Sequence, residues 1–172
     1  MRPYLAAAYN LACWITGNPT DAQDVVQEAM LRAFRFFDDF RGDNLRAWLL
    51  KIVRNTALSA RAVNRAAGRV PLQPEWFESV ASTDARWSLG SEPPGDPALI
   101  SITEEEVAAL RRAIANLGAE FREVLILREF EDFSYREIAA ITGSPIGTVM
   151  SRLSRARDEL TRVMRDERGE KP

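Results

Sequence analysis

Residues 134–155, which read SYREIAAITGSPIGTVMSRLSR, carry the clearest fold signal in this chain. Ser134 and Glu137 have the spacing of a capping box, which predicts the start of a short helix. Gly143 is suited to a reversal of the chain, and Pro145 is a favourable first residue for a second helix. These proportions are typical of a helix-turn-helix, and the alternative is an ordinary helix pair with a solvated charged face.

Apolar residues at helical spacing predict helices along most of the remaining chain. The expected segments are about Tyr4 to Ile15, Thr20 to near Phe40, Leu45 to Ala66, Glu104 to Leu117, and Ala119 to Glu131. Thr20 with Gln23, and Thr103 with Glu106, have capping-box spacing, and Gly118 is expected to end the fourth segment. The expected apolar stripes are Val26, Met30, Ala33 and Phe37; Trp48, Leu49, Ile52, Val53 and Thr56; and Ile146, Val149, Leu153, Ala156, Leu160 and Val163. No strand alternation competes, so the predicted fold class is all-α.

The segment from Val70 to Thr103 is rich in proline and glycine and shows no sustained apolar period, which predicts a flexible linker. It carries five acidic residues against Arg86 alone, so we expect an acidic linker. The predicted organisation is therefore two small helical domains, residues 1–69 and 104–172, joined by residues 70–103.

Composition excludes several classes of function. The 172-residue chain has no histidine and a single cysteine, Cys13. An internal disulfide, a Cys/His zinc site and Ser-His or Cys-His catalysis are therefore excluded, and we expect no enzyme activity, cofactor or metal. No run of 18 apolar residues occurs, and the apolar N-terminus lacks a clean signal-peptide cleavage site. We expect a cytoplasmic protein without membrane insertion, in which Cys13 is a buried spacer.

Charge is distributed unevenly along the chain. Residues 44–74 contain six cations and no acid, and residues 146–157 contain three arginines and no acid. Basic islands of this kind are typical of phosphate binding. The second island lies on the second helix of the expected helix-turn-helix, whose exposed face should offer Thr148, Ser151, Arg152 and Arg155 to DNA.

Two separate sets of motifs resemble one known family. Residues 130–139 (FEDFSYREIA) and 144–149 (SPIGTV) resemble the promoter-reading second domain of bacterial sigma factors of the extracytoplasmic-function (ECF) type, within the sigma-70 family. Residues 21–28 (DAQDVVQE) look like the helix with which that family binds core polymerase. Residues 40–43 (FRGD), Trp48-Leu49 and 54–56 (RNT) look like its reader of the −10 promoter element. The resemblance covers about residues 5–66 and 104–165.

The resemblance implies a sigma factor that binds core RNA polymerase, directs it to promoter DNA through −10 and −35 elements and promotes initiation. An anti-sigma factor is implied as a further partner. The matching core-polymerase positions are Asp21, Asp24, Gln27, Glu28, Leu31 and Arg32. The matching −10 positions are Phe40, Arg41, Asp43, Asn44, Arg46, Lys51, Arg54 and Asn55, whereas Trp48 is expected in the core. The matching −35 positions are Arg128, Tyr135, Pro145, Gly147, Thr148, Met150, Ser151, Ser154 and Arg155.

Two departures from the family pattern affect these expectations. Many relatives carry arginine where Met150 stands and a larger residue at Ser154, so the −35 sequence is not carried over. Relatives also have more residues before the position of Tyr4, so the first helix is truncated or the start lies upstream. The alternative function is a stand-alone helix-turn-helix regulator that binds a palindrome as a dimer. A small helical hydrolase is disfavoured because no paired acid-base constellation is present.

A relaxed linker of about 34 residues spans only ~30 Å, whereas promoter elements about two helical turns apart are separated by ~70 Å. The two domains therefore reach both elements only when the linker is held extended. We expect the free protein to recognise promoters poorly.

Overall fold

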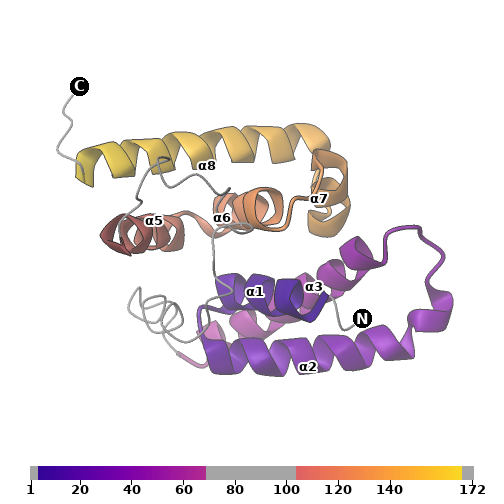
Figure 1. Ribbon diagram of the computed structural model, residues 1–172. Coiled ribbons are helices and arrows are strands. Elements are labelled where there is room, and N and C mark those ends of the chain that lie inside the picture. Colours follow the sequence, from indigo (N-terminus) through magenta and orange to yellow (C-terminus); the bar gives the residue numbers. More distant parts are fainter. Residues whose placement is uncertain (1–3, 69–103, 168–172) are drawn as a thin grey trace.

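A computed structural model describes residues 4–68 and 104–167, and every regular element in these ranges is helical (Figure 1). The N-terminal part comprises α1 (Leu5–Thr16), α2 (Pro19–Arg35), the short 3₁₀ turn η2 (Phe37–Asp39) and α3 (Leu45–Ala66). The C-terminal part comprises α5 (Glu104–Asn116), α6 (Ala119–Leu125), the π-helical turn η4 (Ile126–Phe130), α7 (Tyr135–Thr142) and α8 (Ile146–Glu167). The all-α prediction is confirmed. The predicted linker and the Thr103–Glu106 capping box lie outside the described residues.

Helices α1, α2 and α3 pack on one another around a core of fully buried side chains. Leu11, Leu49 and Val53 have no exposed surface, and α2 faces them with the small side chains of Ala22, Ala29 and Ala33. Alanines at this spacing let helix axes approach closely, because little side-chain volume separates the backbones. The bounds predicted for the third helix are those of α3.

Two details of α2 differ from the prediction. Asn18, rather than the predicted Thr20–Gln23 box, caps the helix by accepting hydrogen bonds from the backbone N–H groups of Thr20 and Asp21, and Pro19 is the first helical residue. The fully buried face consists of alanines with Val25, so the predicted stripe is wrong in part, because this face of α2 packs against α1 and α3. Val26 and Met30 are only partly buried.

The end of α2 also differs from the prediction. The helix ends at Arg35 instead of near Phe40, because the chain tightens into η2. Phe37, the last residue of the predicted stripe, therefore lies beyond the helix and is 45% exposed.

The predicted helix from Ala119 to Glu131 is present, but its last turn widens. The N–H of Glu131 bonds to the carbonyl of Ile126, five residues back, at 3.1 Å. The fourth predicted helix ends just before Gly118, at Asn116, and Gly118 itself has φ −52° and is the N-cap of α6. Glycine is tolerated at an N-cap although it is more strongly favoured just after a helix end, and here one glycine lies between two consecutive helices.

The helix-turn-helix is confirmed. The Ser134 hydroxyl accepts a hydrogen bond from the Glu137 N–H, and the Glu137 carboxylate accepts one from the Ser134 N–H, which completes the capping box. Gly143 has φ +67°, a left-handed conformation that glycine adopts without strain. Ile138 and Val149 are fully buried between α7 and α8, so the two helices are held at a fixed angle.

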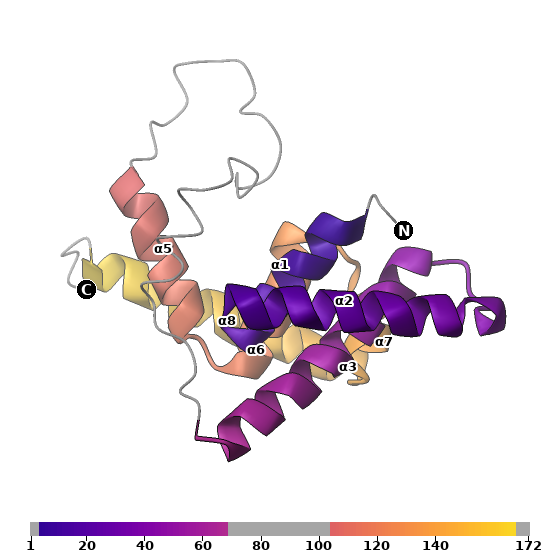
Figure 2. The same ribbon diagram turned by 90° about the horizontal axis from the view of Figure 1, so that it is seen from below.

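The two domains are stacked on one another (Figures 1 and 2). Helix α1 contacts α6 and η4, and α3 contacts α7, whereas α8 and α2 form the outer layers of the C-terminal and N-terminal domains. This contact between the domains was not predicted from the sequence.

Cys13 lies in the core of the N-terminal domain, with no exposed surface, as predicted. Burial raises the pKa of its thiol from 9.0 to about 11, against an opposing hydrogen bond with Tyr9. Since the thiolate is the reactive form, at pH 8 we expect alkylation of the folded protein to be about 100-fold slower than that of the chain in guanidinium. The native rate should rise with pH up to about 11. Fast native alkylation at pH 8 would show that α1 opens readily.

Candidate nucleic-acid interface at the contact between the domains

Arg46, at the start of the basic helix α3, is held by the C-terminal domain. Its Nη2 lies 2.5 Å from Oε2 of Glu131, and its Nη1 donates to the Glu131 carbonyl at 2.7 Å. The guanidinium also lies over the Phe133 ring, 4.4 Å from its centroid. The Glu131 side chain is only 5% exposed. Burial raises the pKa of Glu131, opposed by Arg46 and by a hydrogen bond from Asn10.

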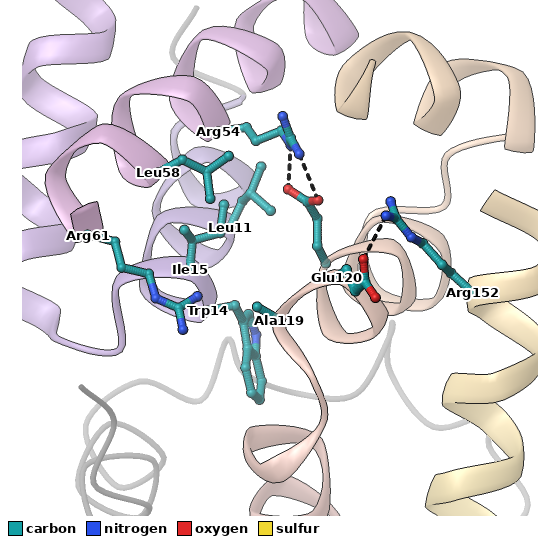
Figure 3. A pocket seen from close by; sticks show the side chains of 10 residues that line it. Leu11, Trp14, Ile15, Arg54, Leu58, Arg61, Ala119, Glu120 and Arg152 are labelled. Carbon is teal, nitrogen blue, oxygen red and sulfur yellow. Dashed lines mark hydrogen bonds and ion pairs between the residues drawn. The ribbon is translucent and has the colours of Figure 1, made fainter. Parts of the chain in front are cut away.

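Arg54, two turns further along α3, makes a second cross-domain ion pair. Its Nε and Nη2 donate to the two carboxylate oxygens of Glu123 at 2.5 and 3.1 Å (Figure 3). The two side chains are 17% and 8% exposed. This fork is the geometry in which arginine binds carboxylate or phosphate most strongly, because two parallel hydrogen bonds share the charge.

Two further hydrogen bonds complete the contact between the domains. The Asn44 side chain caps α3 through the Ala47 N–H and donates to Oε1 of Glu137. Hydrogen bonds from Ser134 lower the pKa of Glu137, so the carboxylate is ionised there. Arg122, 4% exposed, donates to the carbonyls of Trp14 and Leu117, and burial lowers its pKa to about 10.

Most of the remaining predicted −10 positions are exposed. Arg41, Asp43, Lys51 and Asn55 lie at the surface. Phe40 is partly buried, and its ring packs on Trp48 with centroids 5.0 Å apart, which is consistent with a core role for Trp48. The structure therefore divides the set into accessible positions and the three positions, Asn44, Arg46 and Arg54, that the C-terminal domain occupies.

Most of the predicted −35 set forms one exposed face at the start of α8. Thr148 is partly buried, and the exposed members are Pro145, Gly147, Met150, Ser151, Ser154 and Arg155. Arg128 of η4 and Tyr135 of α7 contact each other, with the guanidinium 5.4 Å from the ring centroid.

Arg152 does not belong to the exposed face, contrary to the prediction. Its guanidinium bonds to Glu120 at 2.7 Å and to the Ser144 hydroxyl at 3.2 Å (Figure 3). The reason is that position 152 lies on the side of α8 that packs against α6.

The predicted polymerase-binding positions lie along α2. Asp24, Gln27 and Leu31 are exposed, and Glu28 pairs with Arg32 at 2.7 Å on the same surface. Asp21 is partly buried and accepts a hydrogen bond from Asn64 of α3, so it joins the two helices. Leu31 is 61% exposed, an unusual state for a large apolar side chain.

The sequence analysis did not predict the exposure of three aromatic residues next to this surface. Phe34, Phe36 and Phe37 follow Leu31 and are 68%, 50% and 45% exposed. Exposed apolar clusters of this kind mark interaction sites. The sequence signal was the group of phenylalanines itself. Two of them, Phe34 and Phe36, do not follow the helical spacing of the predicted apolar stripe.

Comparison with known proteins identifies both domains. The family model described as Sigma-70 region 2 matches residues 1–66, and the model described as Sigma-70, region 4 matches residues 108–160. The RNA polymerase sigma-H factor of Pseudomonas aeruginosa is 36% identical over 148 residues, covering 84% of this chain and 73% of that protein. This chain belongs to the sigma-70 family, as an ECF-type sigma factor.

Other relatives agree with this family membership. The ECF RNA polymerase sigma-E factor of Escherichia coli K12 is 36% identical over 141 residues, covering 81% of this sigma factor and 72% of its relative. The sigma factor RpoE of Bartonella quintana, solved in complex with the anti-sigma factor NepR, matches with a TM-score of 0.64 and 31% identity. That match covers 94% of this chain and 92% of the other.

The sigma factor shows no site for a metal in the described ranges, since no cluster of three or more acidic, cysteine or histidine ligands occurs there. None of the described helices is both long and apolar enough to span a bilayer. A groove of about 250 Å³ lies between the domains beside the Arg54–Glu123 pair, lined by Leu11, Trp14 and Arg61 among others (Figure 3).

Proposed function

We propose that this sigma factor binds core RNA polymerase, directs it to promoters with −10 and −35 elements and promotes initiation. The observation that carries the proposal is the helix-turn-helix, whose second helix begins with an exposed polar face that includes Arg155. The N-terminal part of such a helix enters the major groove, where its side chains meet base edges and phosphates.

Recognition of the −10 element is assigned to α3 and to the loop that precedes it. A strand-separated base is held by stacking and by polar groups that read its exposed edge. Arg41, Asp43 and Asn44 supply such groups, and Lys51, Arg54 and Asn55 on α3 supply charge and hydrogen bonds toward the backbone. The two proposed DNA-binding surfaces, on α3 and on α8, lie in separate domains. This arrangement fits a promoter with separate −10 and −35 elements.

Binding of core polymerase is assigned to the exposed surface of α2. We define the α2 surface as Asp24, Gln27, Glu28, Leu31 and Arg32, together with the adjacent Phe34. Its combination of charged groups around exposed apolar side chains is typical of a protein interface with an apolar centre and a polar rim. The sigma factor performs no chemistry itself in this proposal, and it acts in the cytoplasm with the polymerase.

Control by an anti-sigma factor is part of the proposal. Support comes from the Bartonella quintana RpoE, which resembles this chain over nearly its whole length and was solved with the anti-sigma factor NepR. A partner of this kind would cover the polymerase-binding or DNA-binding surfaces and keep the sigma factor inactive.

Run-off transcription tests the proposed function. Genomic DNA fragments that bind reconstituted holoenzyme are selected, sequenced and used as templates with purified core enzyme. We expect discrete transcripts that require the sigma factor and start at a fixed distance from the selected elements. Failure to bind core, or tight binding of a palindrome without polymerase, would overturn the proposal in favour of a stand-alone regulator.

A further inference from the structure

Two large apolar side chains on α8 are exposed and take no part in the core. Met150 is 52% exposed and Ile146 is 43% exposed, and within the described residues of the C-terminal domain no other large apolar side chain is this accessible. They stand four residues apart, so they are neighbours on one face of the helix. Val149 and Leu153, on the other side of α8, are the residues that pack into the core.

The residues next to Met150 on this face are small. Gly147 and Ser154 lie one turn before and one turn after it, and both are exposed. A Cβ atom on Gly147 would meet nothing within 4 Å, so no other side chain lies against the helix there. The Ser151 hydroxyl donates to the carbonyl of Thr148 at 3.0 Å and is held against the helix backbone. A partner that approaches this face therefore meets the Met150 side chain before it meets the backbone.

The charged groups near Met150 are fewer than the sequence suggests. Residues 146–157 contain three arginines, and two of them are paired within the C-terminal domain. Arg152 bonds to Glu120, and Arg157 bonds to a glutamate of η4. Arg155 is exposed and is the one of the three without a carboxylate partner in the described ranges. The exposed face therefore combines one available cation with an apolar surface.

We propose that Met150, flanked by Ile146, recognises the methyl group of a thymine in the −35 element. This inference rests on the proposed function, because it takes from it that the start of α8 enters the major groove. The thymine methyl is the apolar group that base edges present in that groove, whereas a G·C pair presents hydrogen-bonding groups there. An apolar side chain against a G·C pair leaves those groups without partners, which weakens binding. Met150 therefore favours a T·A pair, with the thymine on either strand.

The size and the position of this apolar surface favour DNA over a protein partner. A protein interface takes roughly 20–30 residues on each side around an apolar centre, whereas here two apolar side chains stand among glycine and serine, with Arg155 nearby. Ile146 is the first residue of α8 and Met150 the fifth. The N-terminal residues of the second helix are the ones that contact base edges in a helix-turn-helix.

Holoenzyme binding to promoters that differ by one methyl group tests the proposal. The −35 element of a promoter selected with holoenzyme is randomised in a duplex library, and the bound DNA is sequenced. We expect enrichment of at least one T·A pair. Deoxyuridine in place of that thymine removes only the methyl group and should weaken binding about fourfold. A C·G pair at the same position should weaken binding about tenfold, and 5-methylcytosine should recover about fourfold of that loss.

Variants of Met150 assign the effect to its side chain. Met150→Ser should bind the thymine and deoxyuridine promoters equally, because its short side chain does not reach the methyl group. Met150→Leu keeps an apolar side chain and should keep the fourfold difference, which is about the value of one buried methyl group. The matched control is Met164→Ser, the same change about 21 Å further along α8, which should also keep the difference. Circular dichroism checks that each variant is folded.

Two results would contradict the thymine contact. The first is a randomised −35 element in which no T·A pair is enriched. The second is an equal loss on deoxyuridine in the parent and in Met150→Ser, which would show that another group senses the methyl.

Run-off transcription separates this inference from the proposed function. A parent that transcribes from the selected promoter, but binds its thymine and deoxyuridine forms equally, would overturn the thymine contact alone. A parent that neither binds core nor transcribes would overturn the proposed function, and the thymine contact with it.

Discussion

Leu31→Asp is expected to weaken binding to core RNA polymerase by about 100-fold, or roughly 2.8 kcal/mol. Leu31 is 61% exposed on α2 and contributes little to the core, so its replacement should leave the fold intact. The loss arises because a charged carboxylate must be desolvated where an apolar side chain would otherwise be buried against the polymerase. Biolayer interferometry with immobilised core enzyme measures the change, and thermal unfolding confirms that the variant is folded.

The matched control for this prediction is Leu5→Asp. Leu5 is also an exposed leucine, 42% accessible, but lies at the start of α1, outside the α2 surface. The Leu5→Asp variant should bind core RNA polymerase with the same affinity as the parent protein. Parental affinity in Leu31→Asp would remove α2 from the proposed polymerase interface, and equal losses in both variants would point to a general effect of added charge.

Arg155→Ala and Asn55→Ala should each reduce promoter-specific run-off transcription by about 10- to 100-fold, with polymerase binding unchanged. Both residues are exposed, in the α8 and α3 readers respectively. The magnitude follows from the loss of about 1–3 kcal/mol for a good base or phosphate contact. The measurement uses a cognate promoter selected with holoenzyme, and titration of core in parallel shows that holoenzyme still forms.

Two variants of the same type serve as controls for the readers. Arg165→Ala lies on the same helix as Arg155 but about 15 Å further along its axis, away from the turn. Asn116→Ala lies at the exposed end of α5. Neither should change transcription. Normal transcription from Arg155→Ala and Asn55→Ala together would refute the residue assignments even though the family is established.

The success of prediction depended on whether the decisive signal was local. The capping box joins residues three apart, and the turn needs a left-handed residue at Gly143 itself, so both were visible in the sequence. The predicted stripe of α2 was partly wrong because helical spacing through Val26, Met30, Ala33 and Phe37 did not show which side of the helix the fold covers. The structure instead buries Ala22, Val25, Ala29 and Ala33, on the face that packs against α1 and α3.

The position of Arg152 illustrates a second limit. Charge and helical spacing predicted that Arg152 lies on the DNA-reading face. In the structure its side of α8 packs against α6, where Glu120 accepts a hydrogen bond from its guanidinium. A helical wheel gives the angular position of a side chain and not the identity of the neighbouring helix. The exposed phenylalanines after Leu31 were missed for the same reason, since exposure depends on what the rest of the fold leaves uncovered.

Local sequence signals were enough for the positions of most helices, the Ser134–Glu137 capping box, the turn of the helix-turn-helix and the family, because each depends on residues a few positions apart. The pairing of Arg46 with Glu131 and of Arg54 with Glu123, 85 and 69 positions apart in the chain, became visible only in the folded protein. Residues this far apart in the chain leave no periodic pattern from which their contact could be predicted. These pairs form because burial of apolar side chains brings two helical surfaces together. An arginine removed from water is stable there only where a hydrogen-bond acceptor lies within reach of its guanidinium.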